Sequence, residues 1–323
     1  MHSIQRTVLF TGSGRMADTV GRLWQASPPL TAVGLVMLAV AIPSLVGVLV
    51  DTRVITGAPA WLKPFKFAIS TAVYSLTLAW IFGLLSVWPR MRRVVGWTTA
   101  IVFVLEVAII DMQAWRGTTS HFNAGTVLDR TLFMIMGAAI FIQTIISVAV
   151  AVALWRQRFD DRALGWALRL GMTLTIAGAF TGPLMTRPTP EQLKRARSGA
   201  PMSIIGAHTV GGIDGGPGLP VTGWSVEHGD VRVPHFIGLH AIQVLALFVI
   251  ALRRWRRPES IRVRAVLAFA TSYAVLFVLL LWEALRGHSL IAPDGLATAA
   301  LGIWTAASIV ALGWIAFAHR RRV

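Results

Sequence analysis

The amino-acid sequence predicts an all-α protein, a polytopic transmembrane helical bundle with about eight spans. Of its 323 residues, 55% are hydrophobic and only 14% are charged, which is typical of a membrane protein. Eight charge-poor runs have the length, about 20 residues, that a helix needs to cross the hydrocarbon core. Unpaired backbone N–H and C=O groups find no water in the bilayer, which favours helices. Barrel strands are the other spanning structure, but they would alternate apolar and polar residues over about 10 residues, so these runs are expected to be helices.

Short polar segments separate the expected spans and set their order. The first run is too long for a secretory signal and lacks a convincing cleavage site, so it is expected to remain as the first span after a cytoplasmic segment at 1–29. "PRMRR" (89–93) follows the second span and "RGTTSHFN" (116–123) the third. "RQRFDDR" (156–162) follows the fourth and "RRWRRPESIRVR" (253–264) the sixth. The spans are expected at 30–50, 67–88, 94–115, 131–155, 163–185, 234–252, 265–285 and 296–318.

The basic residues predict the orientation of these spans, because Lys and Arg concentrate in cytoplasmic connections. If the N terminus is cytoplasmic, every short inside connection is basic, and so is the final "HRRRV". Both termini are therefore expected in the cytoplasm, with the lipid bilayer as the surrounding partner. The net charge of +16 follows mostly from this asymmetry. No nucleic-acid partner is expected, since the basic clusters are short, scattered and without a binding fold. The oligomeric state is left open.

The one long connection, residues 186–233, is expected outside the membrane. Thr189 can cap a short helix there, with Pro190 at its first position and Gln192 completing a capping box. "GAHTVGGIDGGPGLP" follows, and its glycines allow close backbone approach. It is not a phosphate loop, because the lysine and the following helix are missing. A folded lid is expected, because the connection contains apolar residues to bury, namely Ile204, Ile205, Val210, Ile213, Leu219, Val221 and Trp224.

Two halves of the chain show a possible parallel 4+4 internal repeat, residues 30–155 and 156–323. Pro64 and Pro234 open the second and sixth spans, and "QAWRG" (113–117) and "EALRG" (283–287) end the third and seventh. Both pairs have the same offset in sequence. Four helices followed by four, each half beginning inside, would be related by an axis along the membrane normal.

Polar residues inside the spans indicate where a site should lie. Glu106 is about 13 Å below the outer end of its helix, a depth at which ionisable groups are rare and usually functional. Gln113 lies on nearly the same face, as Gln243 does for His240. His240 is expected to face the bundle with Glu106 as its partner, whereas His235 is expected at the solvated rim. A hydrogen-bonded packing role is the alternative for His240 and Glu106.

These residues predict a pocket between the halves. Its expected catalytic residues are Glu106, His240, Lys66 and Gln113, with Ser70 beside Lys66. The "RGTTSHFN" turn and the glycine-rich loop would close it from outside. The expected substrate or lid residues are Arg116, His121, Asn123, Asp214, Gln243, Glu283 and Arg286, with His288 nearby.

Histidines also gather on the expected outer face, where a metal site is possible. The chain has no cysteine, which excludes thiolate sites and covalently attached c-type haem. Imidazoles and carboxylates suit haem, copper, iron or zinc. The candidate metal ligands are His121, His208, His235 and His240, and haem or a transition metal is the candidate cofactor.

Four motifs carry a resemblance to a known family. "KPFKFAIS" (63–70), "QAWRGTTSHFN" (113–123), "DGGPGLPVTGWS" (214–225) and "GDVRVPHFIGLHAIQ" (229–243) resemble a family of uncharacterised bacterial integral membrane proteins. The resemblance covers most of the chain. It implies a multi-pass protein of the bacterial cytoplasmic membrane and supplies no reaction.

Three functions stay open on the sequence. The first is a metal- or haem-dependent oxidoreductase with a His/Glu-lined site near the outer leaflet. The second is a proton-coupled transporter of a small polar or anionic solute, with Glu106 as proton carrier and Lys66 and His240 as substrate contacts. The third is a non-catalytic sensor or scaffold. Whether the protein is an enzyme is therefore undecided, and a small-molecule substrate is expected in the first two cases.

Overall fold

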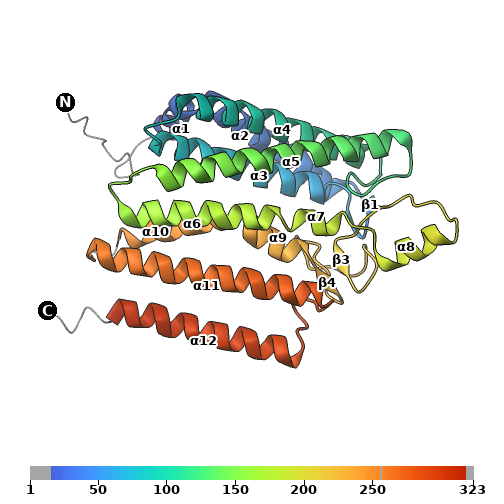
Figure 1. Ribbon diagram of the computed structural model, residues 1–323. Helices are drawn as coiled ribbons and strands as arrows, with labels where there is room; N and C mark the ends of the chain where they lie inside the picture. Colours follow the sequence, from blue (N-terminus) through green and yellow to red (C-terminus); the bar gives the residue numbers. More distant parts are fainter. Residues whose placement is uncertain (1–15, 255–256, 318–323) are drawn as a thin grey trace.

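The structure is a computed structural model that describes residues 16–254 and 257–317. Long helices run side by side, and α1 (Met16–Ala26) and the last turn of α12 (Gly295–Phe317) lie at one end of the bundle (Figure 1). We call this the terminal end. The long connection, the short strands and α8 lie at the opposite end, which we call the loop end. The predicted all-α polytopic bundle is confirmed.

Each expected span corresponds to a helix or a broken helix. In the described residues, seven helical segments are long and apolar enough to cross a membrane, and α9 with α10, bent by 47°, would make an eighth. The spans are α2 (Pro28–Val50), α3 (Leu62–Leu84), α4 (Pro89–Trp115), α5 (Val127–Arg156), α6 (Arg162–Ala179), α9 (Arg232–Leu239) with α10 (Ala241–Leu252), α11 (Glu259–Leu285) and α12 (Gly295–Phe317). The shorter helices are α1 (Met16–Ala26), α7 (Gly182–Met185) and α8 (Pro190–Arg197).

Some helix boundaries differ from the expected ones because helices extend beyond the apolar runs. α3 begins at Leu62 and α11 at Glu259, both ahead of the expected span. α1 was not expected at all. It is an amphipathic helix without fully buried residues that packs against α2 and α3.

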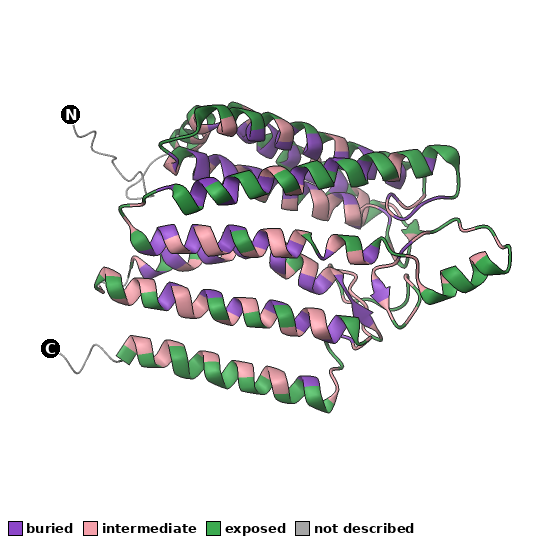
Figure 2. Cartoon of the chain, in the orientation of Figure 1, coloured by how far each residue is buried: buried purple, intermediate pink, exposed green. Residues whose placement is uncertain are grey.

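The helices of the two halves have matching neighbours. α2 packs against α3 and α4, as α6 packs against α9, α10 and α11. α4 contacts α5, α11 contacts α12, and α5 against α6 joins the halves. Buried residues concentrate on the inward faces (Figure 2), and the outer faces are rich in exposed apolar side chains, as a lipid environment requires. α12 is the most peripheral, with Ala297 its one buried residue.

The ends of α4 and α11 are also alike. Gly117 and Gly287 follow them with φ of 72° and 84°, a left-handed conformation that favours glycine. Gly117 N–H donates to the Ala114 carbonyl at 3.1 Å, and Gly287 N–H to the Ala284 carbonyl at 3.0 Å. These similarities support the internal repeat, while superposition of the halves stays a prediction.

The long connection is folded. The capping box of Thr189 and Gln192 is present at the start of α8. Further on, β3 (Thr209–Val210) pairs with β4 (Gly229–Asp230) in antiparallel fashion. Not all of its apolar residues are buried: Ile213 is 87% exposed and Val221 70%, because both lie in the glycine-rich turns at the surface.

Candidate functional site

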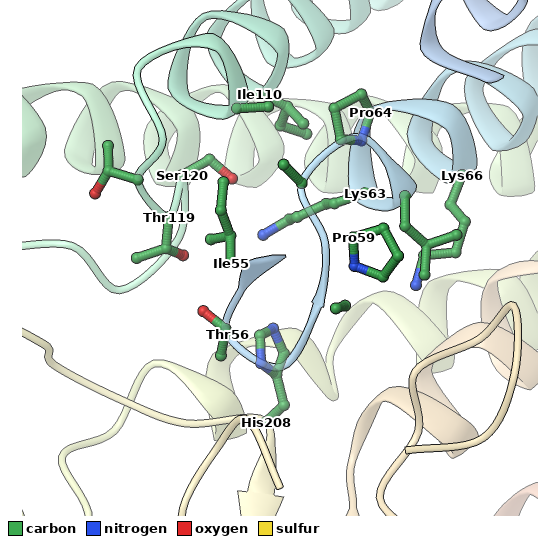
Figure 3. Close-up of a pocket in the computed structure, with 15 residues that line it drawn as sticks. Ile55, Thr56, Pro59, Lys63, Pro64, Lys66, Ile110, Thr119, Ser120 and His208 are labelled. Carbon is green, nitrogen blue, oxygen red and sulfur yellow. The ribbon is translucent and has the colours of Figure 1, made fainter. Parts of the chain in front are cut away.

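A hollow at the loop end is the candidate site. It lies beneath the hairpin of β1 (Val54–Ile55) and β2 (Ala58–Pro59), between the start of α3, the turn after α4 and the long connection (Figure 3). The space amounts to about 520 Å³, part of it open to solvent. Its polar lining comes from Thr56, Lys63, Lys66, Thr118, Thr119, Ser120 and His208. We call it the hairpin pocket. A second hollow beyond the hairpin shares Thr56, Ala58 and His208 with it.

The hairpin itself was not expected from the sequence. Its turn residues, Thr56 and Gly57, both have positive φ, 49° and 71°, which suits a two-residue hairpin. Gly57 lies directly against the glycine-rich loop, where an added Cβ would come within 2.4 Å of the Gly215 carbonyl oxygen. At the base, Arg53 pairs with Asp51 at 2.6 Å and donates to the carbonyl of Trp115 at 3.0 Å. The hairpin is thus held between α4 and the long connection.

Two lysines on one face of α3 supply the positive charge of the pocket. Lys63 and Lys66 are three residues apart, so their side chains leave the helix on the same side. Lys66 Nζ donates to the Thr222 carbonyl at 2.7 Å. Lys63 Nζ has no hydrogen bond or ion pair within the described chain, and it lies 5.8 Å from the centroid of the Phe67 ring. Neither ammonium group has a described carboxylate within 4.0 Å.

Lys63 is a site residue that the sequence reasoning missed. The signal was present, because only Lys63, Lys66 and Lys194 of the 30 basic residues are lysines, and two of them stand in "WLKPFKF". The apolar run appeared to begin at 67, which placed both lysines outside the membrane span. In the structure they belong to the first turn and a half of α3.

Glu106 lies deeper in the bundle and is 2% exposed. Neither carboxylate oxygen has a hydrogen-bond partner among the described residues. Lys63 is the charged group that interacts with it electrostatically, yet the two form no ion pair within 4.0 Å. A buried group of this kind requires a water or ligand as partner.

His208 enters the pocket from the long connection on a rigid support. Its Nδ1 lies 2.8 Å from Asp214 Oδ2, and the backbone N–H groups of His208 and Thr209 also donate to that carboxylate. Burial alone would raise the pKa of Asp214, but these hydrogen bonds hold it well below its usual range. Burial lowers the pKa of His208, so the imidazole is neutral at pH 7. The Phe122 ring packs against it at 4.8 Å.

The four candidate metal ligands do not form a metal site. Within residues 16–254 and 257–317, no three His, Asp or Glu side chains are placed so that they could hold a metal ion. Each imidazole has a local partner on one ring nitrogen, and among these residues no third His, Asp or Glu side chain completes a set of ligands around the remaining nitrogens. His121 Nδ1 lies 3.1 Å from Ser120 Oγ, and burial holds the pKa of His121 well below its usual range. The arrangement therefore gives no support to the expected haem or metal centre.

His235 and His240 have partners other than those expected. His235 is not solvated at the rim: its Nδ1 donates to the Gly178 carbonyl at 2.9 Å and lies 3.0 Å from Thr181 Oγ1. His240 occupies the break between α9 and α10 and lies 3.1 Å from Ser70 Oγ. Glu106 is not its partner. The Gln243 side chain lies beside the imidazole.

The remaining predicted residues lie outside the pocket. Gln113 and Arg116 form a cluster with Asp129 at the loop end, where Gln113 Nε2 donates to Asp129 at 2.9 Å and Arg116 pairs with it at 2.6 Å. Asn123 stabilises the turn by donating to Thr118 and to the carbonyl of Thr119. In the second half, Arg286 pairs with Asp294, and Glu283 is buried beside this pair. These contacts hold the ends of the helices and the turns that follow them.

Comparisons with known proteins leave the site to be interpreted from its geometry. No protein-family model, no curated protein and no solved structure matches the chain. The resemblance of the four motifs therefore stays a prediction.

Proposed function

We propose that this multi-pass membrane protein binds a small anionic solute in the hairpin pocket and couples that binding to a proton carried by Glu106, as a proton-coupled transporter does. Its proposed home is the bacterial cytoplasmic membrane, with both termini in the cytoplasm and the pocket facing outward. The observation that carries the proposal is the pair Lys63 and Lys66, whose ammonium groups share one pocket without a described carboxylate in contact. We prefer this function to the metal- or haem-dependent oxidoreductase, because the described residues contain no group of side chains arranged to hold a metal ion.

The charges around the pocket favour an anion. The acidic groups near it are already engaged: Asp214 accepts from His208, and Asp230 pairs with Arg232 at 2.5 Å. Lys63 and Lys66 form no ion pair with a described carboxylate, and Glu106 and Asp230 act on them only from beyond 4.0 Å. The place is partly buried, where charge interactions are stronger than in water. A carboxylate or phosphate group would supply the missing negative charge and accept hydrogen bonds from both.

A polar region below Glu106 supports the proton-coupling part. Tyr74, whose ring packs against Phe103 at 5.5 Å, has its hydroxyl 3.2 Å from Ser147 Oγ. Gln143 lies beside that hydroxyl and is 7% exposed. Chains of buried polar side chains in membrane proteins often conduct protons. Phe103 precedes Glu106 by about one turn of α4, so Tyr74 packs one turn away from Glu106 along that helix.

The binding part is tested with the purified full-length protein in lipid nanodiscs. Thermal stability is measured with acetate, propionate, lactate and inorganic phosphate at constant ionic strength. Binding stabilises the folded state by mass action, so an anion that fits should raise the melting temperature in a concentration-dependent way. Lys63→Ala and Lys66→Ala should abolish the shift. Lys194→Ala is the matched control, since Lys194 is exposed on α8 and away from the pocket, and it should leave the shift unchanged.

The coupling part is tested separately in proteoliposomes with an imposed pH gradient. Wild type should accumulate the bound anion only with the gradient, and Glu106→Gln should bind the anion without accumulating it. Anion shifts that are equal in the Lys63→Ala and Lys194→Ala variants would overturn the binding site. Gradient-driven uptake that survives Glu106→Gln would overturn the role of Glu106.

A further inference from the structure

The geometry of His208 points to a more specific ligand: we infer that the anion carries a hydrogen-bond donor next to its charged group, as hydroxy acids, amino acids and hydroxylated phosphate esters do. His208 would bind that donor. This inference rests on the proposed anion site and adds the chemical class of its ligand.

The first step is the state of the imidazole. Asp214 accepts hydrogen bonds from the backbone N–H groups of His208 and Thr209 at 2.8 to 3.0 Å. These bonds favour the ionised carboxylate, which can only accept a hydrogen bond from His208 Nδ1. Nδ1 therefore carries the proton and donates it to Asp214 at 2.8 Å. In a neutral ring the other nitrogen, Nε2, is then a pure acceptor.

The second step is that Nε2 is unused and accessible. Among the described residues it has no hydrogen-bond partner, and it is not among the polar atoms sealed from solvent. His208 lines both hollows around the hairpin. The Phe122 ring at 4.8 Å and the bond to Asp214 together restrict rotation of the imidazole. A fixed acceptor is thus presented to the pocket.

The third step is the complementarity between His208 and Lys63. Figure 3 shows both side chains approaching the space beneath the hairpin, Lys63 from α3 and His208 from the long connection. An ammonium group offers donors only, and this imidazole offers an acceptor. Two other hydroxyls of the lining are already occupied, because Thr119 donates to the carbonyl of His121 and Ser120 bonds its ring. A ligand with an anionic group and a neighbouring O–H or N–H would satisfy both sides at once.

The preference should be large, because sites built to bind an O–H or N–H reject analogues that lack it: a bound analogue keeps water away from the acceptor, here Nε2, and leaves it unpaired. Two matched pairs of probes test this: lactate against propionate, and glycerol 3-phosphate against propyl phosphate. Each member of a pair has the same charged group and a similar size. Titration calorimetry on the full-length protein in nanodiscs should show, in at least one pair, affinity about tenfold or more higher for the hydroxylated member.

Two variants separate the acceptor from a packing effect. His208→Phe keeps a ring against Phe122 and removes Nε2, so it should reduce that preference to about onefold while the unhydroxylated anion still binds. His208→Gln replaces the imidazole acceptor by an amide oxygen and should retain part of the preference, which also covers the case that His208→Phe fails to fold. Asp214→Asn should weaken the preference, because the tautomer is no longer fixed.

The outcomes distinguish the inference from the proposed function. If wild type binds both members of each pair equally and Lys63→Ala abolishes that binding, the ligand class is wrong and the anion site stands. If the preference persists in His208→Phe, His208 is not the group that binds the donor. If no probe binds wild type in a manner that depends on Lys63, the anion site and the inference built on it both fall.

Discussion

Ser70 Oγ and His240 Nε2 lie 3.1 Å apart, and the two residues are separated by 170 positions in sequence. This is also the offset between Pro64 and Pro234, which occupy the same position in the first turn of α3 and of α9. A residue can touch its own equivalent only close to the axis that relates two repeats. If the halves are repeats, their axis therefore passes between α3 and the junction of α9 with α10.

Replacing Ser70 tests whether this contact stabilises the association of the halves. Ser70→Ala removes the 3.1 Å contact with the half-buried His240 imidazole, and the loss of such a hydrogen bond costs about 0.5–1.5 kcal/mol. We expect the free energy of unfolding to fall by that amount, measured by reversible denaturation in mixed micelles. Thr77→Ala is the control, since its hydroxyl bonds only Val73 of its own helix, and it should change little. Equal effects of the two substitutions would show that the contact does not stabilise the fold.

The closest helix contact offers a second prediction. Gly178 of α6 and Gly238 of α9 face each other, and a Cβ on Gly178 would lie 2.5 Å from the Gly238 carbonyl carbon. Gly178→Ala must push the two backbones apart, and we expect a loss of about 1–3 kcal/mol or more, as for other overpacked cores. In Gly137→Ala the new methyl would meet nothing within 4 Å, so it should be neutral or stabilise α5 by about 0.5–1 kcal/mol. Thermal melting of both variants checks the contrast, and a mild effect at Gly178 would contradict the close packing.

The helical architecture could be predicted from the sequence because long apolar runs have only one stable form in a bilayer. The site could be predicted only in part. Glu106 stood out by its depth, and Lys66 by its place at the mouth of a span. Their partners could not be inferred, because helices that are apolar all round give no periodic pattern that identifies the inward face. Thus His240 was assigned to Glu106, whereas its contact is Ser70.

The hairpin and the place of Lys63 in the lining of the pocket depend on tertiary structure, so the sequence did not predict them. "DTRVITGAPAW" contains a turn signal in Thr56 and Gly57, but strands of two residues leave no alternation to detect. The presence of His208 in the same pocket as Lys63 likewise follows from the path of the long connection, which sequence periodicity does not describe. Only the local capping box of Thr189 and Gln192 was predictable there, because it depends on residues three apart.

The fold of the long connection should depend on pH through Asp214. Its pKa is lower in the folded protein than in the unfolded chain, where it is about 3.9, because hydrogen bonds from His208 and Thr209 outweigh the effect of burial. The ionised carboxylate therefore stabilises the fold above about pH 4, and this contribution is lost as the pH falls toward the folded-state pKa. We expect Asp214→Asn to lower the melting temperature most near pH 7, with a difference from wild type that shrinks below about pH 4.

The exposed Asp160 at the terminal end provides the comparison for this measurement. Asp160→Asn should lie close to wild type over the same pH range. A melting difference for Asp214→Asn that is independent of pH would show that the carboxylate acts through shape alone and that its charge is not needed.

The last prediction concerns the side of the membrane on which the hairpin pocket opens, since an outer pocket binds solutes from the surroundings and an inner one from the cytoplasm. Ser198 follows α8 at the loop end, and Ser260 lies in the first turn of α11 at the terminal end; both are exposed. The chain has no cysteine, so Ser198→Cys and Ser260→Cys each create a single thiol without background. Basic connections stay in the cytoplasm, and Ser260 lies within the basic segment at 253–264. A membrane-impermeant maleimide added to intact cells should therefore label Ser198→Cys and leave Ser260→Cys unlabelled until the cells are lysed. The reverse pattern would place the pocket in the cytoplasm, and the proposed direction of solute binding would have to be inverted with it.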